Sequence, residues 1–199
     1  MKIIYTKDKE FKTEFENILK RAKSDIKGVS KIVENIIDEI VEDGNEALKR
    51  HIEKFDKWIV KSDDELLISQ KDMKKAYETL DESLKKSLHT AYERIKSYHE
   101  KQLPKSWIDF EENGTILGQK VTAVDRAGLY IPGGKAAYPS SLLMNAIPAM
   151  VAGVKEIVVC TPTPNNEVNE LLLAACHLCG VSKVYKVGGA SAIAAMAYG

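Results

Sequence analysis

Two pairs of adjacent glycines are the residues whose types and spacing best fit ligand chemistry. Gly133-Gly134 and Gly188-Gly189 each follow an apolar run typical of a strand and precede an apolar run typical of a helix. Glycine in such a turn allows positive φ and lets a phosphate or cofactor approach backbone N–H groups. Neither pair matches G-x-G-x-x-G, so cofactor contact and simple turn geometry both stay open. Tyr130 ends the first of these strands, where its ring either faces a ligand or packs inside the protein.

The three cysteines are a second candidate group. Cys176 and Cys179 form a C-x-x-C pair, and Cys160 ends a predicted strand. A zinc site needs four ligands, and one C-x-x-C pair without a second is a weak signal. The pair also falls inside an apolar helical run, where cysteines at i and i+3 pack as small hydrophobic residues. We therefore expect core cysteines, with a thiol metal module as the alternative.

The histidines provide little evidence of chemistry. His51, His89 and His99 lie in charged segments predicted as helices, without a partner at metal-ligand spacing. We expect these side chains to be solvated at the surface. The residues taken alone thus predict a ligand-binding edge with no assigned acid, base or metal ligand.

The bulk composition argues against several classes of protein. Lys+Arg and Asp+Glu both number 29, so there is no basic surplus for nucleic acid or an anionic membrane. No apolar run approaches the roughly 20 residues that cross a bilayer, and charge interrupts the N-terminus where a signal peptide is apolar. The odd cysteine count does not indicate a disulfide framework. We expect a cytoplasmic protein.

Residues 1–125 are predicted to form a helical N-terminal region that ends in a short β-hairpin. Apolar residues recur at helical spacing over 29–41, and Gly44 is placed to end that helix. A second helix is expected over 46–57 with three residues facing inward: Leu48, Ile52 and Phe55. A short strand is expected at 66–68, and Ser69 and Asp81 are expected to cap the next two helices. Period-two alternation around Asn113-Gly114 predicts the hairpin.

Residues 126–199 are predicted to form an incomplete Rossmann-like parallel βα domain, which makes the chain α/β. Strands are expected at 128–131, 156–160 and 183–187, and helices at 141–153, at 168–179 and from near Ser191. Ser140 and Ser141 are placed to cap the first of these helices. Continuous apolar strands fit a parallel sheet that is covered on both faces, and ligands bind at the carboxyl edge of such sheets.

Two long motifs closely resemble histidinol dehydrogenase: RAGLYIPGGKAAYPSSLLMNAIPAMVAGVKEIVVCTP and VYKVGGASAIAAMAYG. The stretches GNEALKRHIEKFD and YHEKQLPKSW are similar as well. The resemblance implies a zinc- and NAD-dependent oxidation of L-histidinol to L-histidine, the last step of histidine biosynthesis. It also implies two related, incomplete Rossmann-like domains, an intertwined homodimer, and a family length more than twice that of this chain, which corresponds to the N-terminal portion.

The resemblance also implies a set of cofactor contacts. Tyr130, with Pro132, Gly133 and Gly134, matches the NAD-binding GLYxPGG motif. Ser191 stands where the family has an NAD-contacting glutamine, and the shorter hydroxyl weakens that contact or routes it through water. The family's zinc ligands, catalytic Glu-His pair and histidinol-binding residues match nothing in these 199 residues. We therefore expect no turnover by the chain alone, and a self-associating, non-catalytic folding or assembly unit is the alternative.

Overall fold

The computed structural model describes residues 3–133 and 138–199, with only the backbone described for 21–27. The helices are α1 (Phe11–Asp43), α2 (Asn45–Asp56), α3 (Gln70–Thr79), α4 (Glu82–Glu100), α5 (Pro139–Val151), α6 (Glu170–Leu178) and α7 (Gly189–Tyr198). Short 3-10 turns are η1 (Asp63–Leu66) and η2 (Pro164–Asn166). The strands are β1 (Leu67–Ile68), β2 (Trp107–Phe110), β3 (Ile116–Gln119), β4 (Arg126–Tyr130), β5 (Glu156–Cys160) and β6 (Lys183–Tyr185). The predicted α/β class is confirmed.

The main sheet has the strand order β1-β6-β5-β4. β4, β5 and β6 run parallel, as their continuous apolar sequences predict. The short strand expected at 66–68 is present as β1, which pairs antiparallel with β6 and sets Leu67 opposite Tyr185. A strand from the N-terminal region therefore completes one edge of the sheet.

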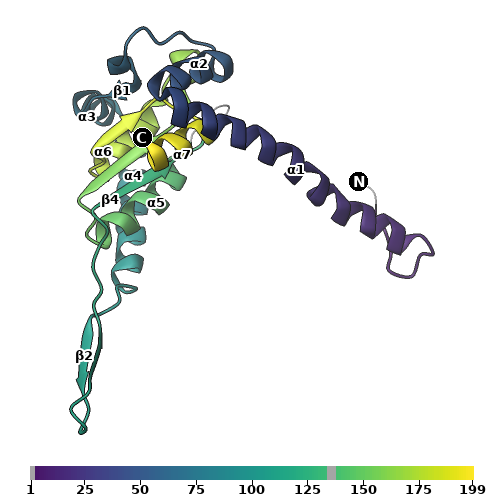
Figure 1. The fold of residues 1–199 in the computed structure, drawn as a ribbon. Coiled ribbons are helices and arrows are strands. Elements are labelled where there is room, and N and C mark those ends of the chain that lie inside the picture. The colour runs from purple at the N-terminus through teal and green to yellow at the C-terminus, as the bar shows by residue number, and fades with distance from the viewer. Residues whose placement is uncertain (1–2, 134–137) are drawn as a thin grey trace.

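Helices cover both faces of this sheet (Figure 1). On one face α5 and α6 pack against the strands, and α4 and α3 pack on them as an outer layer. On the other face α7 packs against β4, with α1 and α2 beyond it. Side chains alternate along β5, so Val159 enters the first core and Cys160 the second. The sheet thus separates two hydrophobic cores.

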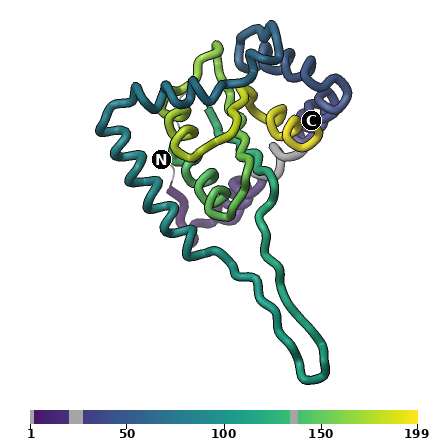
Figure 2. Tube along the Cα trace, turned by 90° about the vertical axis from the view of Figure 1, so that its left-hand side faces the viewer, coloured from purple at the N-terminus to yellow at the C-terminus, as the bar shows by residue number. Residues whose placement is uncertain are grey.

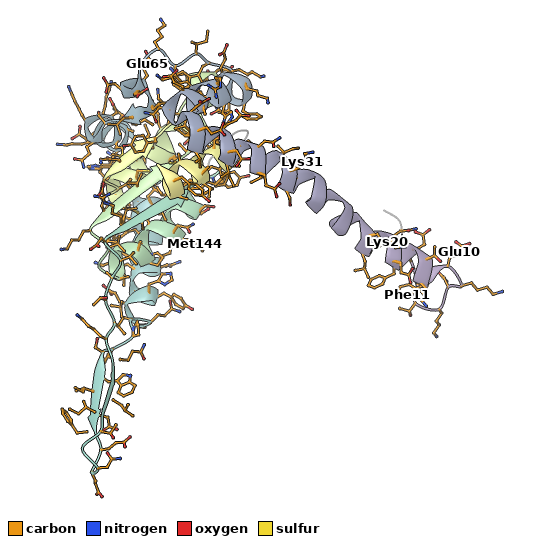
Figure 3. The ribbon with its side chains drawn as sticks, viewed as in Figure 1. Glu10, Phe11, Lys20, Lys31, Glu65 and Met144 are labelled. Atoms are coloured by element: carbon orange, nitrogen blue, oxygen red, sulfur yellow. The ribbon has the colours of Figure 1, made fainter. Side chains whose placement is uncertain are left out.

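α1 is much longer than the helix predicted over 29–41, since it runs for 33 residues. It ends as predicted at Gly44, which has a φ of 55° and donates its N–H to the Ile40 oxygen at 2.9 Å. The N-terminal part of α1 projects from the body as an arm, and Phe11 and Lys20 lie near its far end (Figures 1 and 3). Several large apolar side chains on α1 are exposed: Phe15, Ile18, Leu19, Val29 and Ile32.

The predicted hairpin is also confirmed. β2 and β3 pair antiparallel with Phe110 opposite Ile116, and Gly114 takes a φ of 88° in the turn. The hairpin extends far from the sheet and its helices (Figure 2). Every residue of both strands is exposed, so the hairpin packs on nothing in the described parts of the chain.

Local signals explain most of the helix starts. The side chains of Ser69 and Asp81 accept backbone N–H groups of α3 and α4, as predicted. The predicted caps at Ser140 and Ser141 are wrong, because α5 already begins at Pro139, whose fixed φ and missing N–H suit the first helical turn. Among the described residues, the structure contains no helix that is both long and apolar enough to span a membrane.

Candidate functional site

Three loops meet at the carboxyl ends of the parallel strands, around Pro162. A Cβ on Gly133 would lie 2.7 Å from the Pro162 carbonyl oxygen, and one on Gly188 would overlap the Pro162 side chain. Real side chains do not approach so closely, so the packing of these loops requires glycine at both positions. Turn packing therefore accounts for Gly133 and Gly188, while Gly134 lies outside the described residues.

Tyr130 links the first of these loops to the last. It ends β4 as predicted, is half-buried, and its hydroxyl accepts the Gly189 N–H at 3.3 Å. Gly189 has a φ of 63°, and a Cβ there would meet open space. Position 189 therefore favours glycine because of its positive φ, whereas position 188 requires glycine because of the contact with Pro162. Among the described residues the tyrosine O–H has no acceptor of its own, so it can donate to a ligand.

The first turn of α7 presents unpaired backbone donors at the same edge. α7 begins at Gly189, two residues before the predicted start near Ser191. Within the described part of the chain, the N–H groups of Ala190 and Ser191 have no hydrogen-bond partner. Such groups carry the positive end of the helix dipole and suit an anionic group such as a phosphate.

A pocket of about 270 Å³ opens beside this turn. Residues from α1, α2, the loop after β5 and the start of α7 line it: Ile32, Ile36, His51, Ile52, Phe55, Asp56, Pro162, Val187, Gly188, Gly189, Ala190 and Ser191. The N-terminal helices therefore build one wall, and the glycine-containing loop builds the other.

His51 is buried in this wall, which corrects the prediction that it is solvated. It is only 6% exposed; its Nδ1 lies 2.9 Å from the Ser191 Oγ, and its Nε2 lies 2.9 Å from a Glu39 carboxylate oxygen. The prediction failed because α2 turns His51 inward while Phe55, predicted to face inward, is 54% exposed. The other two histidines were predicted more accurately: His89 is exposed and His99 half-buried.

Asp56 is a second buried polar residue that the sequence reasoning missed. It ends α2, is 6% exposed, and accepts the Thr163 N–H at 2.9 Å. Removal from water raises the pKa of the Asp56 carboxyl, and the Thr163 hydrogen bond partly opposes this. The carboxyl therefore fixes the loop after β5 against α2 at the edge of the pocket.

A sequence signal for these residues did exist. Position 51 falls between Leu48 and Ile52 on the apolar stripe of α2, so helical spacing alone turns His51 inward. A polar residue on a buried stripe needs a partner. That partner, Ser191, lies 140 residues away in sequence, and helical periodicity cannot identify it.

The cysteines lie in the hydrophobic cores. All three are buried, with Cys176 and Cys179 in one core and Cys160 in the other, across the sheet. Burial raises the pKa of the Cys160 thiol to about 11, and it raises the pKa values of the other two further. This separation agrees with core cysteines and does not bring the three sulfurs together around one metal.

The groups implied by the resemblance fit the described residues unequally. An NAD phosphate fits the free N–H groups at the start of α7, and the Tyr130 hydroxyl lies beside them. Zinc does not fit, because no cluster of three or more His, Cys, Asp or Glu side chains among the described residues could hold a metal ion.

Comparison with known proteins identifies the family. A sequence model of histidinol dehydrogenase matches residues 19–199. The chain is 70% identical over 194 residues to histidinol dehydrogenase of Sulfurimonas denitrificans, which covers 98% of this chain and 45% of that protein. It is 61% identical over 199 residues to the Helicobacter hepaticus enzyme, covering 100% of this chain and 46% of that protein.

A solved structure agrees with this assignment. Histidinol dehydrogenase from Elizabethkingia anophelis matches with a TM-score of 0.79 at 30% identity, covering 86% of this chain and 39% of that one. The chain thus spans a little less than half the length of the curated relatives it matches. By sequence and by fold, the chain belongs to the histidinol dehydrogenase family.

Proposed function

We propose that this chain supplies the NAD-binding part of a histidinol dehydrogenase, an oxidoreductase that converts L-histidinol to L-histidine. The observation that carries the proposal is the Tyr130–Gly189 hydrogen bond. It places a tyrosine hydroxyl beside free backbone donors at the start of α7, next to a pocket. Donors of this kind suit the phosphates and hydroxyls of a dinucleotide.

The proposed cofactor contacts are divided among the loops. Tyr130 would donate its hydroxyl proton to NAD, while the loop after β4, with Pro132, Gly133 and Gly134 in its sequence, would lie against the cofactor. Ser191 would make a shorter contact than the glutamine implied by the resemblance. Replacing Ser191 with Gln is expected to tighten NAD binding, because the longer amide adds both a donor and an acceptor.

Isothermal titration of NAD⁺ into the chain and its Ser191→Gln and Tyr130→Ala variants tests this site. We expect the affinity to rise in the Gln variant and to fall in the Ala variant. An absence of binding to the parent and to the Gln variant at millimolar NAD⁺ would falsify the proposed cofactor site.

We also propose that the chain alone does not oxidise histidinol. The resemblance assigns zinc ligands, the catalytic pair and histidinol contacts to a part of the family sequence without a counterpart here. NADH formation with histidinol, NAD⁺ and added zinc or manganese tests this part. Steady turnover by the purified chain would contradict it.

The proposal includes two domains, 1–125 and 126–199, and a homodimer. The division keeps the NAD-binding strands in the second domain, although β1 from the first pairs with β6. The exposed apolar side chains of the α1 arm and of the β2–β3 hairpin support self-association. They also favour the alternative of an assembly unit without catalysis, so light scattering tests both. A monomer at all concentrations would contradict both ideas.

We also propose that the protein lies in the cytoplasm. The three thiols are free in the structure, which suits a reducing compartment.

A further inference from the structure

Glu39, His51 and Ser191 form a chain of hydrogen bonds that joins α1, α2 and α7 at the pocket. We propose that the Glu39–His51 pair holds the Ser191 hydroxyl as a hydrogen-bond acceptor toward the pocket. The ligand group that sits there is then a donor, such as a ribose hydroxyl of a nucleotide. The identity of this ligand rests on the proposed cofactor site, whereas the direction of the hydrogen bonds does not.

The direction follows from the inventory of donors and acceptors. An ionised carboxylate can only accept, so the Glu39 oxygen at 2.9 Å places the imidazole proton on the Nε2 of His51. The Nδ1 of a neutral ring is then a bare acceptor. Ser191 must fill it, so its hydroxyl donates to Nδ1 across the 2.9 Å contact.

Burial makes these hydrogen bonds the main partners of His51 and Ser191. Ser191 is 3% exposed and His51 is 6% exposed, so bulk water competes little for either group. In the opposite tautomer Nε2 and the carboxylate would face each other as two acceptors, and the hydrogen bond between them would be lost. Glu39 itself is half-exposed, and its ion-pairing value is correspondingly modest. The carboxylate acts chiefly by choosing which nitrogen carries the proton.

The consequence for a ligand concerns the remaining lone pairs of Ser191. Its one proton is used by His51, so the Oγ can only accept from a group in the pocket that Ser191 lines. A phosphate or carboxylate oxygen at that point would face another acceptor. The free N–H groups of Ala190 and Ser191 next to it have the opposite preference. A hydroxyl donor beside a phosphate, as in a nucleotide, satisfies both.

The tautomer is measured without any ligand. Nitrogen-15 NMR of histidine-labelled chain at neutral pH is expected to show His51 protonated at Nε2 and bare at Nδ1. Glu39→Gln should weaken this preference, since an amide can donate to Nε2 as well as accept from it. Glu42→Gln, an exposed carboxylate on the same helix, is the matched control and should leave the His51 signals unchanged. A proton on Nδ1 in the parent would overturn the proposal, whether or not Nε2 also carries one.

The ligand class is measured by titrating ADP and 2′,3′-dideoxy-ADP, which share a diphosphate and differ in ribose hydroxyls. One hydrogen bond of about 1 kcal/mol predicts a preference of the parent for ADP of about 5-fold. Ser191→Ala should abolish this preference, Glu39→Gln should reduce it, and Glu42→Gln should keep it.

The outcomes separate the two claims. Equal affinities of the parent for the two nucleotides would overturn the assigned ligand class. If neither nucleotide binds while Nδ1 is bare, the proposed cofactor site and the ligand class both fail. The measured His51 tautomer would nevertheless support the assigned direction of the Ser191 hydrogen bond.

Discussion

The two faces of the β4–β5–β6 sheet are built from different kinds of residue. The face under α5 and α6 holds the larger of the two cores of buried hydrophobic side chains in the described residues. On the opposite side, α1, α2, α7 and the loop around Pro162 form a pocket lined by three of the buried polar side chains found in the described residues: His51, Asp56 and Ser191. Polar groups are costly to bury, so their collection at one edge points to a task other than stability.

The buried polar groups also differ in whether they have hydrogen-bond partners. The His51 ring and the Asp56 carboxyl have hydrogen-bond partners, whereas the Thr163 hydroxyl and the Trp58 indole N–H are buried without one in the described structure. His51 and Asp56 line the pocket, and Trp58 packs in the core on the same side of the sheet. Substitutions on the hydrophobic face should therefore change stability, whereas substitutions on the pocket side should change ligand binding as well as stability.

The largest effect is expected on the hydrophobic face. Ile147 of α5 is fully buried, so Ile147→Ala should lower the free energy of unfolding by about 2–5 kcal/mol. Urea unfolding measures this. Met144→Ala is the control, because Met144 lies on the same helix and is 63% exposed (Figure 3). An equal loss in both variants would break the contrast between buried and exposed positions.

The next effect separates the two glycines that precede α7. Gly188→Ala should cost about 1–3 kcal/mol through overlap with Pro162, and Gly189→Ala about 1–2 kcal/mol through its positive φ. Pro162→Gly in each background distinguishes the causes by a double-mutant cycle of unfolding free energies. We expect coupling of Pro162 with Gly188 alone. Coupling of the same size with Gly189 would contradict the assigned packing.

A smaller effect is expected from one hydroxyl on the pocket side. Tyr130→Phe removes the acceptor of the Gly189 N–H and should weaken NAD⁺ binding by about 2–10-fold, which corresponds to one hydrogen bond. Titration calorimetry measures this. Tyr198→Phe, at the exposed far end of α7, should bind as the parent does. Unchanged affinity in the Tyr130 variant would separate this hydroxyl from the cofactor.

The smallest expected effect is a change in how the free energy of unfolding depends on pH. Burial raises the folded-state pKa of Asp56, so its stability contribution is full below the unfolded pKa and is lost as pH rises through the folded pKa. Asp56→Asn removes that loss. As pH rises from about 4 toward neutral, the parent should therefore lose part of its unfolding free energy, and the Asn variant should not lose this part.

Asp63 gives the opposite sign and serves as the control. Hydrogen bonds from Lys49 and Asn45 lower its pKa, so its stabilisation is present above the unfolded pKa and is lost as pH falls. Asp63→Asn should thus remove a gain in stability that the parent shows as pH rises toward about 4, whereas the Asp56 effect lies above that pH. Shifts of the same sign in both variants would refute this difference between the pocket side and the surface.

The sequence predicted what short-range physics controls. Apolar runs located β4, β5 and β6, and Gly44, Ser69 and Asp81 ended or capped helices as expected. α5 and α7 begin earlier than predicted, at Pro139 and Gly189, and neither has a side-chain cap that the sequence could have revealed.

The polar wall of the pocket was beyond prediction for a physical reason. Burial of His51 depends on Glu39 and Ser191, which come from other helices, and no periodicity within α2 identifies them. Packing of Pro162 against Gly133 and Gly188 is likewise a contact between distant loops. The motifs placed the edge of the sheet correctly, but only tertiary structure shows what lines it.

The most direct test follows the backbone amide signals of the chain by NMR during titration with NAD⁺. We expect shifts at the loop after β4 and at the first turn of α7, where the Gly189 N–H is bonded to Tyr130 and the N–H groups of Ala190 and Ser191 lack a partner among the described residues. The amides of α3 and α4, on the hydrophobic face, should stay in place. Shifts centred on α3 and α4, or no shifts at millimolar NAD⁺, would contradict the assignment of the pocket side as the cofactor-binding face.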